Sequence, residues 1–66
     1  MSIEEITKIA KKHRCTKIVA VKTVYFFLFG LQSQANSFAA WAHENKLGYL
    51  RSTKNKWVAV KVKSLP

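Results

Sequence analysis

The last predicted strand carries the side chains best suited to chemistry with an anionic partner. Successive side chains on a strand point to opposite faces, so Trp57, Lys61 and Lys63 share one face while three valines form the other. An exposed aromatic ring among ammonium groups can stack on a nucleic-acid base while the ammonium groups contact phosphates. This face therefore predicts binding of nucleic acid.

Cations outnumber acids throughout the chain. Twelve Lys and Arg stand against three acids, which gives a net charge of +9, and the acids are confined to Glu4, Glu5 and Glu44. Such an imbalance favours a polyanionic partner. The residues that we expect to contact nucleic acid are Arg51, Lys54, Lys56, Trp57, Lys61 and Lys63 around the last hairpin, with Lys12 and Arg14 as a second basic patch.

Two other interpretations of these residues stay open. In the first, Trp57 covers the edge of the core, and the lysines only solvate the last strand and keep it from pairing with other chains. In the second, the chain is a small inhibitor or modulator, of the kind that phages and plasmids encode. It would then use aromatic anchors to dock on an acidic surface of a larger enzyme.

Residues suited to catalysis or metal binding are few. The sequence lacks the motifs of serine hydrolases, P-loop enzymes and zinc proteases. Glu4 and Glu5 belong to the first turn of a helix, which leaves Glu44 as the one free carboxylate. Cys15 and His13 could form a nucleophile pair on paper, but nothing nearby would orient the imidazole. We therefore predict a protein that is not an enzyme and binds no cofactor and no metal.

The first element is predicted to be a helix over residues 3–14. Ser2 and Glu5 have the spacing of a capping box, in which each side chain bonds the backbone N–H of the other residue. Acids begin this helix and cations end it, which complements the helix dipole. Its narrow apolar stripe consists of Ile3, Ile6, Ile9 and Ala10.

The residues from Val24 to Leu31 form an apolar run that the rest of the chain must cover. Such a run is typical of a strand buried on both faces, and Gly30 is expected to end the strand. Residues 16–21 before it are β-branched and apolar, and also predict a strand. Lys22-Thr23 is either a tight reversal between two strands or part of one long bent strand over residues 16–29. The two alternatives stay open, because Lys-Thr is poor chemistry for a two-residue turn.

A second helix is predicted over residues 34–47, with Ser33 as its N-cap and Gly48 as its C′ residue. Trp41 lies beside its apolar stripe, where it is either a flank of the core or an exposed anchor. That stripe consists of Ala35, Phe38, Ala39, Ala42 and Leu47.

A terminal hairpin follows, with strands over residues 49–53 and 56–63 and a reversal at Lys54-Asn55. The valine row of its last strand, Val58, Val60 and Val62, is expected to face the core.

Together these elements predict one α+β domain over residues 1–66, in the order α-β(β)-α-β-β. We expect a three- or four-stranded, mostly antiparallel sheet packed against two helices. A chain of this size is only marginally able to build its own core, so a homodimer stays open. A single cysteine favours a reducing compartment, and the longest apolar run is too short for a membrane span. We therefore expect a cytoplasmic protein that binds DNA or RNA without catalysis, in an accessory or regulatory role.

Overall fold

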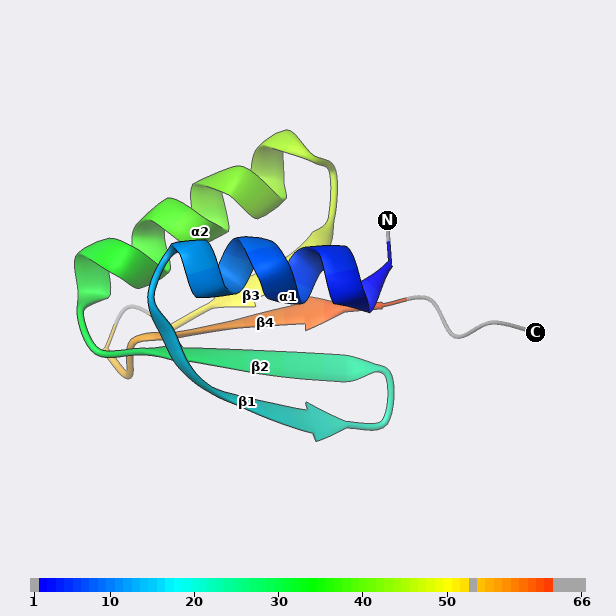
Figure 1. The fold of residues 1–66 in the computed structure, drawn as a ribbon, viewed down its shortest axis with the longest axis horizontal. Helices are drawn as coiled ribbons and strands as arrows, with labels where there is room; N and C mark the ends of the chain where they lie inside the picture. The colour runs from blue at the N-terminus through cyan, green and yellow to red at the C-terminus, as the bar shows by residue number, and fades with distance from the viewer. Residues whose placement is uncertain (1, 53, 63–66) are drawn as a thin grey trace.

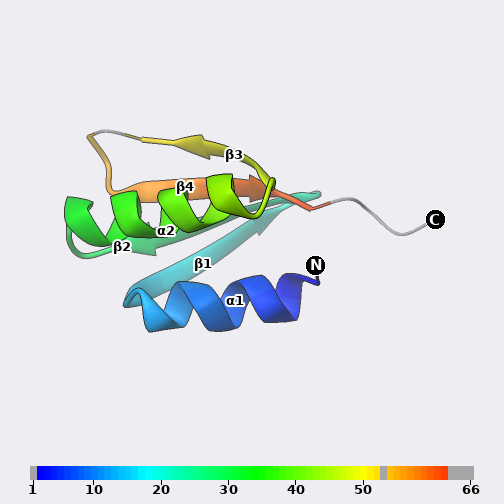
Figure 2. The ribbon, with the colours of Figure 1, turned by 90° about the horizontal axis from the view of Figure 1, so that it is seen from above.

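The computed structural model describes residues 2–52 and 54–62, and shows two helices packed on a four-stranded antiparallel sheet (Figure 1). Along the sheet the strands lie in the order β1-β2-β4-β3. Both helices lie on the same face of the sheet, α1 near β1 and α2 over β4 and its neighbours (Figures 1 and 2). This confirms the predicted α+β domain and its element order. The elements are α1 (Ile3–Lys12), β1 (Cys15–Val21), β2 (Val24–Phe29), α2 (Gln32–Glu44), β3 (Gly48–Arg51) and β4 (Trp57–Lys61).

Helix α1 begins with the predicted capping box. The backbone N–H of Glu5 donates to Ser2 Oγ at 3.3 Å, and the N–H of Ser2 donates to the Glu5 carboxylate at 3.4 Å. The helix ends two residues earlier than predicted, because Arg14 adopts a positive φ of 70° that turns the chain into β1. Ile6 and Ala10 are buried on its inner side.

The chain reverses at Lys22-Thr23, so residues 16–29 form two strands and not one long bent strand. Strands β1 and β2 form a tight hairpin, with Val21 paired to Val24 across the reversal. Lys22 adopts a φ of 57°, so a lysine occupies the left-handed conformation that glycine or asparagine usually takes in such turns.

The prediction that the apolar run is buried on both faces is wrong. Burial alternates along the second half of β2: Phe27 and Phe29 are buried under the helices, while Phe26 and Leu28 are only half-buried on the opposite face. Both helices cover the same face, and no described element covers the other. The two faces of this one strand therefore differ in environment although both are apolar.

Helix α2 differs from its prediction at both ends. Its N-cap is Leu31, whose N–H donates to Gln34 Oε1 at 3.2 Å, while Ser33 lies within the first turn. At the other end Lys46 is the C′ residue, with a φ of 57°. The Lys46 N–H donates to His43 O at 3.1 Å and the Leu47 N–H to Ala42 O at 3.0 Å, which is a Schellman motif. Gly48 belongs instead to β3.

The core forms where α2 crosses the centre of the sheet. The Phe38 ring lies 5.2 Å from that of Phe27 and 5.5 Å from that of Phe29. Trp41 is half-buried and stacks on Phe38 at 5.5 Å, so it flanks the core as one of its two interpretations expected. The predicted valine row is also confirmed, because Val58 and Val60 are fully buried and Val62 packs against the same cluster.

The terminal hairpin has shorter strands than predicted. Ser52 Oγ accepts the N–H groups of Lys54 and Asn55, at 3.3 and 2.9 Å, and so shapes the turn before β4. Thr53 and Lys63, which were placed in these strands, lie outside the described residues. Within residues 2–52 and 54–62, no helix is long and apolar enough to cross a membrane.

Candidate nucleic-acid interface

The sheet has an open face, which we define as the face opposite the helices. The register places on it every second residue of each strand: Lys17, Val19 and Val21 of β1, Val24, Phe26 and Leu28 of β2, Trp57, Ala59 and Lys61 of β4, and Gly48 and Leu50 of β3. Leu50 is 70% exposed and Val21 is 51% exposed. Apolar side chains therefore stand in solvent at the sheet surface, bordered by lysines.

Trp57 belongs to this open face. It is half-buried, and its ring packs against the Phe26 ring in a T-shaped arrangement, with centroids 5.4 Å apart and planes inclined by 71°. Among the described residues, those packed against the buried cluster include Trp41 but not Trp57. The interpretation of Trp57 as a cover for the core edge therefore has no support in the packing.

A shallow hollow lies farther along the same face. Ala59 forms its floor and Gly48 leaves one side without a side chain, while Val24, Leu50 and Lys61 stand around it. The hollow has a volume of about 220 Å³. Ala59 is only 3% exposed, although it lies outside the core cluster. The walls are mainly apolar, with one ammonium group at the rim.

Lys17 is a cation of the open face that the sequence analysis did not select. In the register it lies opposite Leu28, and Leu28 lies opposite Trp57, so the three side chains form one row across the sheet. The sequence could have indicated Lys17 only if β1 had been paired with β2, and that pairing requires the hairpin at Lys22-Thr23.

One end of the molecule concentrates positive charge. The last turn of α1, the start of β1, the end of β3 and the start of β4 meet there (Figure 1). Seven of the twelve Lys and Arg lie at this basic end, which we define by Lys11, Lys12, Arg14, Lys17, Arg51, Lys54 and Lys56. All seven are exposed.

Among the residues that the structure describes, the opposite end is close to electrically balanced. It carries the first turn of α1, the last turn of α2 and the β1–β2 turn. All three acids of the chain lie at this end, as do the cations Lys22, Lys46 and Lys61. The acids of α1 and α2 therefore leave the charge of the basic end uncompensated.

The structure brings most of the predicted site residues together. Trp57 lies at the basic end with five predicted cations, namely Lys12, Arg14, Arg51, Lys54 and Lys56. Arg51 lies opposite Val58, which places it toward the helix side of the sheet rather than on the open face. Lys61 shares the open face with Trp57 but lies at the far end of β4. Lys63 lies outside the described residues.

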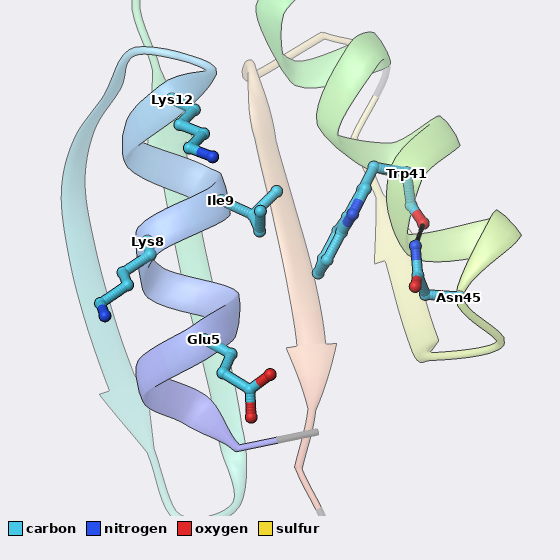
Figure 3. A pocket seen from close by; sticks show the side chains of 6 residues that line it. All are labelled: Glu5, Lys8, Ile9, Lys12, Trp41 and Asn45. Carbon is cyan, nitrogen blue, oxygen red and sulfur yellow. Dashed lines mark hydrogen bonds between the residues drawn. The ribbon is translucent and has the colours of Figure 1, made fainter.

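A second depression separates the two helices, with a volume of about 310 Å³ (Figure 3). Ile9 of α1 faces Trp41 of α2 across it, with Lys12 near one end and Glu5 near the other. Asn45 Nδ2 donates to the Trp41 carbonyl at 2.8 Å, which ties the last turn of α2. This depression is open and shallow, and its polar groups differ in sign.

The thiol of Cys15 is held in its neutral form. Partial burial raises the pKa of the Cys15 thiol, against weaker lowering by backbone hydrogen bonding of Lys17 and Leu28 and by the charge of Lys11. The thiol also donates a hydrogen bond to the Lys17 carbonyl at 3.2 Å, which favours the neutral form. A neutral thiol is a poor nucleophile and a poor metal ligand. Among the described residues, no group of three or more His, Cys, Asp or Glu side chains is placed to hold a metal ion.

No protein-family model, curated protein or solved structure shows a significant match to this chain. The function must therefore be argued from the geometry and charge of the interface itself.

Proposed function

We propose that this protein is a non-catalytic nucleic-acid-binding module. The observation that supports this most is the basic end, where seven exposed cations gather and none of the three acids lies. Lys and Arg bind phosphates through charge and hydrogen bonds, and each contact releases counterions from the nucleic acid. A cluster of this size on a small domain is the electrostatic footprint of a phosphate-binding surface.

The binding is expected to have low sequence specificity. Phosphate contacts fix the position of a protein on its partner but carry no direct sequence information. The cations of the basic end come from α1, β1 and the β3–β4 hairpin, so they surround one end of the sheet rather than line a groove-reading helix. An accessory or regulatory role, which needs affinity without catalysis, suits such a surface.

A protein with an acidic surface is the second candidate partner. The exposed apolar side chains Leu50 and Val21 favour it, because exposed apolar residues grouped on one face often mark sites of protein association. The basic end would then steer the chain to the acidic partner.

We also propose a cytoplasmic location. Cys15 is a free thiol, and a free thiol persists most readily in a reducing compartment.

The test is the fluorescence anisotropy of a labelled single-stranded oligonucleotide, titrated with the protein at 50 and 200 mM salt. With about five phosphate contacts and a slope of about −0.7 per contact, the affinity should fall about 100-fold between the two salt concentrations. An absence of binding at 50 mM salt to both single-stranded and duplex probes would refute the proposal.

A further inference from the structure

We propose that the open face binds the unpaired bases of a single-stranded nucleic acid, at two positions along β4. One base stacks on Trp57, and the next base enters the hollow over Ala59. This inference rests on the proposed binding of phosphates at the basic end, and adds the class of nucleic acid to it.

Trp57 has the setting of a stacking platform. Trp57 is half-buried, and the edge contact with Phe26, at 5.4 Å between ring centroids, holds its ring in place without covering it fully. Bases stack on aromatic rings of sheet surfaces in other single-strand binders, and this needs no particular base because every base has a π-face. Leu28 lies beside Trp57 in the same row across the sheet, and Lys17 lies beyond Leu28. The Lys17 ammonium group is therefore the cation of the basic end that shares this row.

The hollow provides the second position. Ala59 is two residues beyond Trp57 on β4, which places its centre about 7 Å farther along the strand. Its apolar walls would cover the faces of a planar ring, and the Lys61 ammonium at its rim would lie near the attached phosphate. Charge complementarity thus supports a nucleic acid as the occupant, because Lys17 lies in the same row as Trp57 and Lys61 lies at the rim of the hollow.

A duplex fits this face poorly. Its bases are stacked and paired, so proteins reach only the base edges, through grooves. Four strands at spacings of about 4.8 Å span about 14 Å before their side chains are counted, which exceeds the roughly 12 Å width of the major groove. Duplex binding is therefore left to the phosphate contacts of the basic end.

The decisive variant is Gly48→Val, which adds a side chain at the hollow and narrows it. A Cβ atom at Gly48 meets no heavy atom within 4 Å, and valine is well suited to strands, so the fold should be kept. The matched control is Gly30→Ala, which also has free space for its Cβ but lies outside the open face. Thermal unfolding followed by circular dichroism verifies that both variants are folded.

We expect Gly48→Val to weaken binding of a single-stranded 12-mer about tenfold while leaving duplex binding unchanged. Gly30→Ala should bind both probes like the original protein. Unchanged single-strand binding by folded Gly48→Val would overturn the inference. If the same substitution instead abolished a dimer in sedimentation, with oligonucleotide binding intact, the open face would be a self-association surface and the inference would also fail.

An abasic strand separates this inference from the proposed function. It keeps the sugar-phosphate chain but offers no bases, so it should bind about tenfold or more weakly than the intact strand and respond little to Gly48→Val. Equal binding of abasic and intact strands would overturn the base sites while leaving the phosphate contacts in place. If the unsubstituted protein bound neither strand and no duplex, the proposed function itself would be wrong.

Discussion

The two faces of the sheet are built from similar residues and have different environments. Phe27 points toward the helices and is fully buried, whereas its neighbour Phe26 points to the open face and is only half-buried. Val60 and Val58 are likewise fully buried, while Val19 and Val21 on the open face are 38% and 51% exposed. Residue type alone therefore does not decide which face of this sheet forms the core.

The covered face stabilises the fold, and the open face is the one that we propose for binding. Phe38 contacts both Phe27 and Phe29, so the covered face carries the close packing that stabilises the fold. The open face keeps apolar surface in water, which a small domain can seldom spare, and borders it with Lys17 and Lys61. Burial of these apolar side chains by the proposed partner would be favourable.

The largest expected effect is a loss of stability, which should differ between two adjacent phenylalanines that lie on opposite faces of the sheet. Phe27→Ala should lower the free energy of unfolding by about 3–5 kcal/mol, because it leaves a cavity under α2. For a domain of this size that change can abolish folding. Phe26→Ala should cost about 1 kcal/mol, since its side chain is already partly in water. Urea unfolding followed by circular dichroism measures both.

Oligonucleotide binding by the same variants gives a second test of the two faces. Folded Phe26→Ala should weaken single-strand binding, because Trp57 loses the ring that holds it. Equal losses of stability for the two phenylalanine variants would contradict the division of the sheet into a structural and a binding face.

A smaller effect is expected for the helix layer. Lys46 takes a left-handed φ of 57° at the C′ position of α2, where glycine is favoured. Lys46→Gly should therefore raise the free energy of unfolding by about 1 kcal/mol, with the Schellman hydrogen bonds kept. Its effect on single-strand binding should be slight, because Lys46 lies far from the basic end. A destabilised Lys46→Gly protein would show that the lysine makes contacts that outweigh its backbone strain.

Local sequence signals predicted much of the fold. The capping box at Ser2 and Glu5 and the alternation along the last strand each depend on neighbouring residues only, and both are present in the structure. The alternation also placed Trp57 and Lys61 on the side away from the core. The gathering of Arg51, Lys54 and Lys56 in one hairpin followed from the same reasoning.

Other features depend on how distant elements pack, and a sequence pattern does not contain that information. The apolar run of β2 is the same whether one or two layers cover it, and only the placement of both helices on one side exposes Phe26 and Leu28. The Lys22-Thr23 reversal and the end of α2 at Lys46 use lysines in conformations that usually indicate glycine. The position of Lys17 in the row with Trp57 requires the resulting register.

The most direct test of the central claim compares two pairs of charge substitutions with the same change in net charge. The double variant Lys17→Gln and Lys56→Gln removes two cations of the basic end, and Lys22→Gln with Lys46→Gln removes two from the opposite end. The salt dependence of single-strand binding, measured by anisotropy, should become shallower by about 1.4 for the first pair and should scarcely change for the second. Equal changes for both pairs would show that overall charge, and not the basic end, determines binding.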